Sequence, residues 1–407
     1  MTNQNAKARL SRETVVLGII AFFVMVGFGV VVPILPVFVR SFGVGYVEVG
    51  AVVSAFALVR FISSPFVGKL IDFGGERIIL AIGIGIVAVS SAMVGFAQSY
   101  LEILLLRGAG GIGSAMFSIS AMSLLLATTD ASMRGRAVGF YQGGFLIGGM
   151  AGPAIGGVLA LISLRAPFFF YAGTLVVAGV VGLAMLRQTK KSGDDTSAKS
   201  APSLSLRAMF ADSRYLVACA ANFATGWAGL GVRSALVPIL VVELLNDSEV
   251  WTGISFAIAA VVQTIFLAPA GWFVDKVGRR PAIIGAFALG GIAMLLIPFV
   301  TELWQLIVLL CVYGVAASFM GTAPASLVGD VAGPKSGQPV AIFSAFSDLG
   351  AIVGPLAAGF LLDQASYPAA FGSAVLLLLA VSIFALILKP SPKNRASEVS
   401  VLDTSAG

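Results

Sequence analysis

Long apolar runs alternate with short polar ones along the whole chain. A helix needs about 20 mostly apolar residues to cross the hydrocarbon layer of a membrane, and the 407 residues contain twelve such runs. They form two groups of six, at 15–39, 46–69, 78–98, 101–127, 135–161 and 166–186, and at 214–243, 250–273, 281–300, 303–328, 338–362 and 368–388. The pattern predicts an all-α membrane protein, and the even number of spans places both chain ends on the same side.

A polar stretch rich in Ser and charged residues separates the two groups. The expected organisation is an N-terminal tail at 1–14, a six-helix bundle at 15–186, a linker at 187–213, a second six-helix bundle at 214–388 and a C-terminal tail at 389–407. Two bundles of equal size suggest an internal repeat.

Composition supports the membrane assignment and removes several functions. The chain is 58% hydrophobic and 11% charged, with a mean hydropathy of +1.01, which a water-soluble fold has no core large enough to bury. The absence of histidine excludes a His-based catalytic triad and a His metal site. Proton coupling, if present, must therefore use carboxylates or their ion pairs. We expect no metal and no cofactor.

The positive charge follows the membrane topology rather than a nucleic-acid surface. Of the 25 Lys and Arg residues, 20 fall in loops and tails on one expected side and two on the other, so we expect both termini in the cytoplasm and a location in the inner cell membrane. The remaining three lie inside apolar runs and become functional candidates: Arg60, Arg107 and Arg233.

Three landmarks recur in the two halves at nearly constant spacing. They are Val32–Leu35 with Val237–Leu240 at an offset of 205, Gly68–Asp72 with Gly271–Asp275 at 203, and Gly148–Pro153 with Gly350–Pro355 at 202. Because each pair falls on the same helix of its half and in the same orientation, the sequence predicts a parallel repeat about an axis normal to the membrane.

These landmarks resemble the major facilitator superfamily. The loops at 68–77 and 271–280 are similar to its signature G-x-L-x-D-R-x-G-R-[RK]. In that family the loop latches the outward-open state through its aspartate, a basic residue and an acid at the end of a later helix. The resemblance assigns this latch to Gly271, Asp275, Arg279 and Asp330, and in the first half to Gly68, Asp72, Arg77 and Asp130. Glu76 stands where the pattern expects arginine, so Arg77 would have to substitute for it.

Two further motifs point to the drug:proton antiporter branch of that family. The fifth helix matches G-x-x-x-G-P-x-x-G-G in full, with Gly148, Gly152, Pro153, Gly156 and Gly157. Glycines at every fourth position share one helix face, and proline removes a backbone hydrogen bond, so the motif predicts a closely packed, bendable seam. On the fourth helix, Arg107 begins a segment similar to R-x-x-q-G-x-G in which glycine replaces the usual glutamine. An arginine there can keep a nearby carboxylate ionised, although snorkelling to the surface explains it equally well.

The leading proton-coupling candidate is Asp348, the only carboxylate well inside an apolar run. Arg60 lies at a similar depth on the second helix, and in the resembling family the second and eleventh helices are neighbours, so the two residues could pair. Such a pair would serve either proton coupling or structure alone. Weaker candidates for the substrate cavity, each of which also suits helix packing, are Gln142, Asn222, Trp227, Arg233 and Gln263.

Together these features predict a monomeric secondary transporter that exports small amphipathic, drug-like organic compounds in exchange for protons by alternating access. Its other partners are the lipid bilayer and no nucleic acid. A proton-coupled carrier of metabolites or sugars, in either direction, remains the alternative, because the fold and the latch motifs serve both. A membrane enzyme or sensor is a remote alternative, since the spans carry no cluster of catalytic groups.

Overall fold

The computed structural model describes residues 10–130, 133–186, 206–332 and 337–388. All regular secondary structure in these residues is helical, and they contain twelve segments long and apolar enough to cross a membrane. The predicted all-α fold with twelve membrane helices is therefore confirmed. The two chain ends and most of the linker lie outside the described residues.

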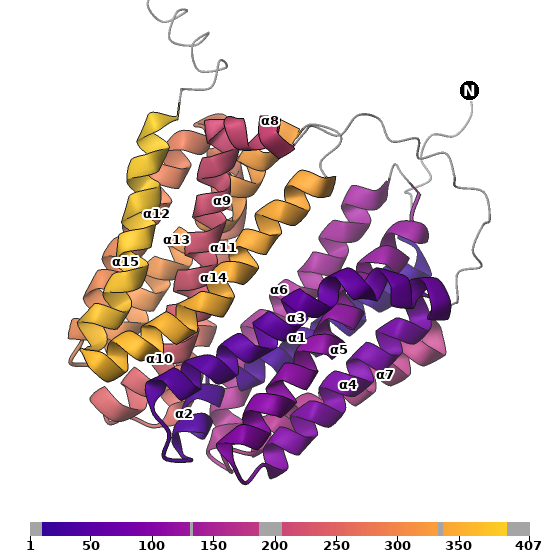
Figure 1. Cartoon of the computed structure of the whole chain (residues 1–407), viewed down its shortest axis with the longest axis horizontal. Coiled ribbons are helices and arrows are strands. Elements are labelled where there is room, and N and C mark those ends of the chain that lie inside the picture. The colour runs from indigo at the N-terminus through magenta and orange to yellow at the C-terminus, as the bar shows by residue number, and fades with distance from the viewer. Residues whose placement is uncertain (1–9, 131–132, 187–205, 333–336, 389–407) are drawn as a thin grey trace, which may run out of the picture. The chain divides into compact units, whose positions relative to one another are not determined.

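The helices follow the chain in two series, which Figure 1 colours from indigo to yellow. The first series is α1 (Arg12–Val31), α2 (Leu35–Arg40), α3 (Tyr46–Gly74), α4 (Glu76–Phe96), α5 (Tyr100–Ala127), α6 (Arg134–Ala160) and α7 (Ala166–Met185). The second is α8 (Leu206–Ala211), α9 (Ser213–Thr225), η2 (Gly226–Arg233), α10 (Ser234–Ile239), η3 (Leu240–Leu244), α11 (Glu249–Lys276), α12 (Arg279–Leu296), η4 (Ile297–Phe299), α13 (Leu303–Ala332), α14 (Gly337–Gln364), α15 (Tyr367–Phe384) and η5 (Ala385–Ile387).

The chain forms two compact units that do not coincide with the two series at every residue. The first consists of 1–44, 51–197 and 248–257, and the second of 45–50, 198–247 and 258–407. The first turn of α3 thus belongs to the second unit, and the first turns of α11 belong to the first unit. Both helices continue from one unit into the other.

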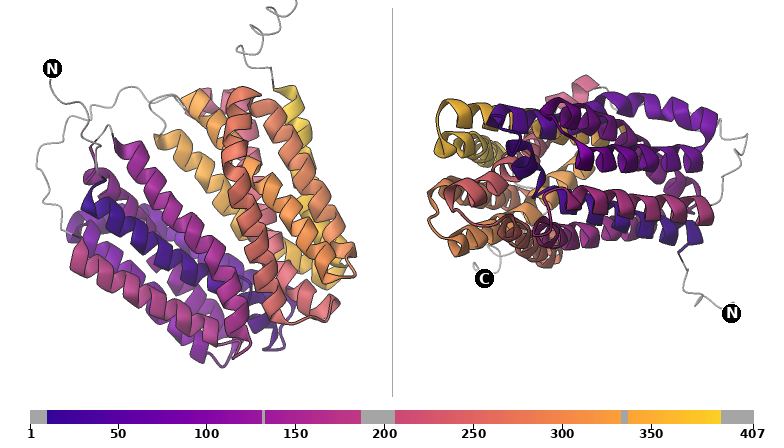
Figure 2. Two further views of the ribbon diagram at one scale, coloured as in Figure 1. Left: turned by 180° about the vertical axis from the view of Figure 1, so that it is seen from behind. Right: turned by 90° about the horizontal axis from the view of Figure 1, so that it is seen from below.

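Helix pairing inside each unit follows one scheme. In the first unit α1 packs on α6 and α7, while α4 packs on α5 and α7. In the second, the helix formed by α9 and η2 packs on α14 and α15, while α12 packs on α13 and α15. Within each unit the helices run side by side in every view (Figure 1; Figure 2). Helices that correspond at a sequence offset of about 203 residues thus have corresponding packing neighbours in the two units.

Two of the predicted spans are less regular than the sequence indicated. The run at 15–39 is not one helix, because α1 ends at Val31 and α2 begins at Leu35; Pro33 between them has no N–H for the helical ladder. The run at 214–243 stays helical, but it widens into a π-helix at η2 and again at η3. The sequence of η2, Gly-Trp-Ala-Gly-Leu-Gly-Val-Arg, has few side chains to hold a regular α-helical turn.

Candidate functional site

The glycines of the antiporter-like motif form a backbone-to-backbone seam between α6 and α1. A β-carbon added at Gly148 would lie 2.6 Å from the carbonyl oxygen of Phe22, and one at Gly152 would lie 2.6 Å from that of Val26. Gly156 is even closer to the backbone of Val30. Any side chain at these positions would push the two helices apart. Gly157 faces elsewhere, toward the first turns of α11 near Val250.

The second unit contains the counterpart of this seam, between α14 and the π-helical segment η2. A β-carbon at Gly350 would lie 2.7 Å from the amide nitrogen of Trp227, and one at Gly354 would lie 3.0 Å from the Cα atom of the same residue. From the other side, Gly226 and Gly231 of η2 approach α14 just as closely. π-helical segments within α-helices are frequent at functional sites, and η2 lies against α14, the helix that carries Asp348.

The turn between α11 and α12 forms an ion pair. Arg279 Nε lies 2.6 Å from Asp330 Oδ2, and Arg279 Nη2 donates to Asp330 Oδ1 at 2.9 Å. Gly278 has a φ of 123°, which favours glycine, so it permits the sharp turn that places Arg279 at the start of α12. Asp275 is exposed and forms no hydrogen bond or ion pair with the residues described. Gly271 has open space around it.

The equivalent turn of the first unit is built differently. Arg77 donates to the backbone carbonyl of Leu183 at the end of α7, as Arg280 does to that of Leu386 at the end of the second unit. Arg77 is thus the counterpart of Arg280, and the structure does not bring it to Asp130, which is exposed. Glu76 occupies the place of Arg279.

The remaining latch candidates of the first unit lie on either side of this turn. Glu76 accepts a hydrogen bond from Ser123 at 3.4 Å. Asp72 and Gly68 are exposed near the end of α3, and Gly68 has open space around it. In this turn the glycine with a positive φ is Gly75, and its φ of 76° permits the turn into α4.

Arg107 of α5 is the most buried candidate charge, with 7% of its surface exposed. Its guanidinium carbon lies 4.5 Å above the centre of the Phe56 ring. In the part of the chain that the structure describes it forms no ion pair, and its Nε has no hydrogen-bond partner. An arginine at the centre of a membrane helix costs about 2.5–3.5 kcal/mol, which is an upper limit for Arg107 two turns into α5, and a desolvated cation–π contact returns about 2 kcal/mol. The contact with Phe56 offsets part of the cost of burial.

Arg60 and Asp348 lie in different units, so their predicted pairing stays a prediction. Both residues are half buried. The glycines Gly111 and Gly314 approach the backbone at Arg60 and at Gln263, respectively, so Arg60 and Gln263 occupy equivalent positions of the repeat.

The weaker cavity candidates divide into residues with packing partners and residues without. Asn222 donates to the carbonyl of Phe343 on α14 at 2.7 Å, and Trp227 donates to Ser373 on α15 at 3.1 Å. Arg233 lies 5.3 Å from the centre of the Tyr313 ring. Gln142 is exposed and Gln263 half buried, and the amide groups of both lack a hydrogen-bond partner among the described residues.

A carboxylate that the sequence did not single out lies at the first turn of α3. Asp363 of α14 accepts hydrogen bonds from the backbone amides of Tyr46 at 3.0 Å and Val47 at 2.9 Å, and the Tyr46 hydroxyl donates to Glu243. Gly359 allows this approach, since a β-carbon there would lie 3.0 Å from the Cα atom of Val47. Asp363 therefore caps a helix whose remainder belongs to the other unit. Asp363 lies near the end of α14, four residues before α15, and no sequence motif marks it.

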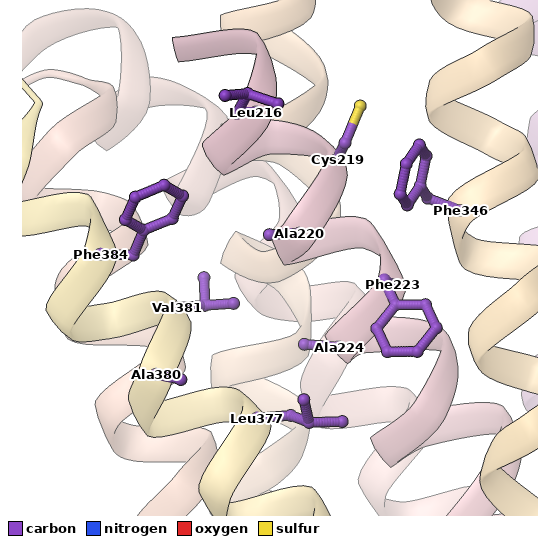
Figure 3. A pocket seen from close by; sticks show the side chains of 10 residues that line it. All are labelled: Leu216, Cys219, Ala220, Phe223, Ala224, Phe346, Leu377, Ala380, Val381 and Phe384. Carbon is purple, nitrogen blue, oxygen red and sulfur yellow. The ribbon is translucent and has the colours of Figure 1, made fainter. Parts of the chain in front are cut away.

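An apolar groove of about 540 Å³ opens on the second unit between α9, α14 and α15 (Figure 3). Phe223, Phe346 and Phe384 contribute rings from the three helices, and Cys219 is the one sulfur-bearing side chain of the lining. Its walls carry no charge, so it offers a ligand only apolar contacts.

Twelve membrane helices in two similarly paired groups, each with a glycine seam, are the architecture of a secondary transporter. The family model named Major Facilitator Superfamily matches residues 17–266 and 231–403. The chain belongs to this superfamily.

Curated relatives match most of the chain at low identity. The quinolone resistance protein NorA of Staphylococcus aureus (strain COL) is 24% identical over 358 residues, which cover 87% of this chain and 91% of the relative. An uncharacterised transporter of the same superfamily from Methanocaldococcus jannaschii is 25% identical over 359 residues, covering 87% and 92%.

Solved structures share the fold at still lower identity. A bacterial homologue of the human lysosomal transporter Spinster, in an inward-facing and unoccupied conformation, has a TM-score of 0.75 and 16% identity, covering 94% of this chain and 96% of its own. The human organic anion transporter MFSD10 has a TM-score of 0.66 and 19% identity, covering 92% and 99%. The nucleoside transporter NupG has a TM-score of 0.73 and 14% identity, covering 93% and 100%.

Proposed function

We propose that the chain is a secondary active transporter that exports small amphipathic, drug-like organic compounds in exchange for protons by alternating access. The observation that carries this proposal is the seam between α6 and α1, where Gly148, Gly152 and Gly156 meet backbone atoms. A seam without side chains lets two helices slide or bend against each other at low cost. The full motif on α6 is the one that resembles antiporters.

The substrate class draws support from the relatives. A protein named for quinolone resistance matches most of the chain, which favours a drug-like organic compound over a sugar. The apolar groove on the second unit and the scarcity of charge on the spans agree with an amphipathic rather than a strongly polar cargo.

The proposal of proton coupling rests on which carboxylates lie inside the membrane spans. With no histidine in the chain, Asp348 is the carboxylate placed well inside a span and the leading proton carrier. Burial favours the protonated acid and a nearby arginine favours the charged form, so a change of surroundings during transport would load and release a proton. Arg60 is the proposed partner of Asp348, and Arg107 is a further cation proposed to take part in proton coupling.

The proposed setting is the inner cell membrane, with both termini in the cytoplasm and the chain acting as a monomer. The bias of Lys and Arg toward one set of loops supports this orientation. In this orientation the α11–α12 turn, with its Arg279–Asp330 ion pair, lies at the cytoplasmic surface.

The test is transport by the purified protein in proteoliposomes with an imposed pH gradient. Drug-like fluorescent compounds should move against their own gradient when protons move the other way, and a protonophore should abolish the movement. Transport that ignores the pH gradient would overturn proton antiport. Counterflow of sugars or metabolites, without transport of any drug-like compound, would instead establish the alternative carrier.

A further inference from the structure

Arg107 brings five N–H donors into the interior of the first unit and uses none of them on the described chain. The nearest acid along α5, Glu102, is occupied at the start of the helix, where it accepts hydrogen bonds from the Gln98 amide at 3.0 Å and the Ser99 hydroxyl at 3.1 Å. We expected an arginine at this position to keep a nearby carboxylate ionised. Helix α5 does not supply that carboxylate.

The next position on the same face of α5, residue 110, is a glycine and supplies no side-chain partner. Gly110 lies one turn beyond Arg107, where the resembling motif has glutamine, and a β-carbon there would already lie 3.5 Å from the Phe56 ring. A glutamine would place an amide oxygen beside the guanidinium. Glycine instead leaves the charge facing the ring, with no internal acceptor.

The free end of the side chain reaches accessible surface. Nε is fully buried without a partner, whereas the terminal nitrogens, which also lack partners among the described residues, are not enclosed and account for part of the 7% exposure of Arg107. The unused terminal donors are thus less completely enclosed than Nε.

The Phe56 ring that Arg107 contacts belongs to a chain of aromatic rings from three other helices. The Phe56 ring of α3 lies 5.9 Å from that of Phe28 of α1, which in turn lies 6.5 Å from that of Tyr171 of α7. Phe56 and Tyr171 are buried, and Phe28 is partly exposed. An unneutralised cation beside apolar rings matches a ligand with a negative group attached to an aromatic or aliphatic body.

We propose that Arg107, Phe56 and Phe28 form a subsite for the carboxylate of an amphipathic organic anion. The proposal rests on the proposed transport function and specifies its substrate class. Arg107 Nη groups donate to the carboxylate, and the rings contact the body of the ligand. The incoming anion supplies the counter-charge that the described chain does not supply, so binding relieves the cost of the buried arginine.

The test compares 1-pyrenebutyrate with its uncharged methyl ester, both binding to purified protein in detergent and both referenced to protein-free micelles. Wild-type protein should bind the acid at least tenfold more tightly than the ester. Arg107→Gln should lose at least tenfold in affinity for the acid and less than twofold for the ester. Arg107→Lys should fall between, because lysine keeps the charge but not the planar fork.

Arg165→Gln is the matched control. It removes the same charge from the same unit, and Arg165 also faces a ring, that of Phe38 at 6.0 Å. Its guanidinium, however, already donates to the carbonyls of Gly95 at 3.0 Å and Ala97 at 3.1 Å. Its removal should leave the preference for acid over ester unchanged.

Several results would overturn the subsite. If Arg107→Gln lowered the affinity for the acid and for the ester equally, the role of the arginine would be structural. If wild-type protein bound the acid and the ester with equal affinity, the carboxylate would not be recognised, and this result does not depend on whether the variant folds. Binding is measured without a gradient, so the two proposals fail separately. Acid-selective binding without proton-driven transport would refute antiport alone, and proton-driven export without acid selectivity would refute the subsite alone.

Discussion

Gly148 and Gly149 are adjacent on α6 and face different sides of the helix, which permits a matched test of the seam. A β-carbon at Gly148 would lie 2.6 Å from the Phe22 carbonyl oxygen and 2.9 Å from the Val26 amide nitrogen. One at Gly149 would lie 3.6 Å from the end of the Met25 side chain, an ordinary contact. We therefore expect Gly148→Ala to be harmful and Gly149→Ala to be tolerated.

The size of the difference follows from the geometry. To bring the new methyl group of Gly148→Ala to about 3.4 Å from the Phe22 oxygen, α1 and α6 must separate by about 0.8 Å. Overpacking of this kind costs about 1–3 kcal/mol. The gain in helix propensity from glycine to alanine, about 1 kcal/mol, applies to both variants and cancels in the comparison. Gly148→Ala should therefore be about 1–3 kcal/mol less stable than Gly149→Ala.

Thermal and denaturant unfolding of the two purified variants in the same detergent measures this difference, and proteoliposome transport measures its consequence. Transport should fall with Gly148→Ala and be nearly abolished by Gly152→Leu, while membrane insertion stays normal because an added apolar side chain does not hinder it. Equal stability and equal transport of the two alanine variants, or normal transport by Gly152→Leu, would refute the role of the seam.

Four other substitutions test separate parts of the molecule. Asp348→Asn should bind substrate but lose pH-gradient-driven export, because the amide side chain cannot take up and release a proton. Arg60→Ala should severely impair transport, because it leaves a buried acid unpaired. An Asp348→Asn variant that exports normally and still responds to the gradient would assign the proton to another group. A cysteine replacing Gly193, in a background free of native cysteines, should resist an impermeant thiol reagent added outside intact cells, and labelling from outside would reverse the topology. Asp363→Leu removes the cap of α3, worth about 0.5–2 kcal/mol, so hydrogen exchange at the first-turn amides should rise by about 2- to 30-fold; unchanged exchange there would show that the cap contributes nothing.

The membrane spans were predictable because the bilayer leaves the chain few alternatives. Every backbone group must be bonded inside the hydrocarbon layer, so a long apolar run becomes a helix whatever its neighbours. Irregularities inside a span were harder to predict, since they depend on packing partners. Pro33 breaks the first span, whereas Pro153 and Pro355 stay inside continuous helices. The same residue type thus gave different outcomes.

Motifs located the candidate site better than they identified its contacts. The spacing of the second loop motif placed Arg279 and Asp330 in the set that the structure brings together, yet Asp275 of the same set forms no pair with either. In the first unit, Arg77 was expected to substitute for the missing basic residue, but its guanidinium bonds to the Leu183 carbonyl. Which way a long side chain points depends on tertiary neighbours that lie far away in sequence.

The two halves of the repeat agree in their glycines and differ in their charges. Gly152 and Gly354, equivalent at an offset of 202, each sit in a backbone seam. At the same offset Asp363, the cap of α3, corresponds to Leu161, which has no acceptor to offer. The glycines fix how closely helices approach, a requirement shared by both halves, because close approach depends only on the backbone.

Charged and polar groups face no such shared requirement. In the first unit, Glu76 stands at the position equivalent to Arg279, which forms the ion pair with Asp330 in the second unit. Likewise, Arg60 of the first unit corresponds to Gln263 of the second. A symmetric set of charges would present the same surroundings to a ligand or proton from either half. Because the charges differ while the seams are alike, we infer that the shared backbone seams provide the movement. The unshared side chains then provide the proton coupling, for which Arg60 is proposed, and the substrate selectivity, for which Arg107 is proposed.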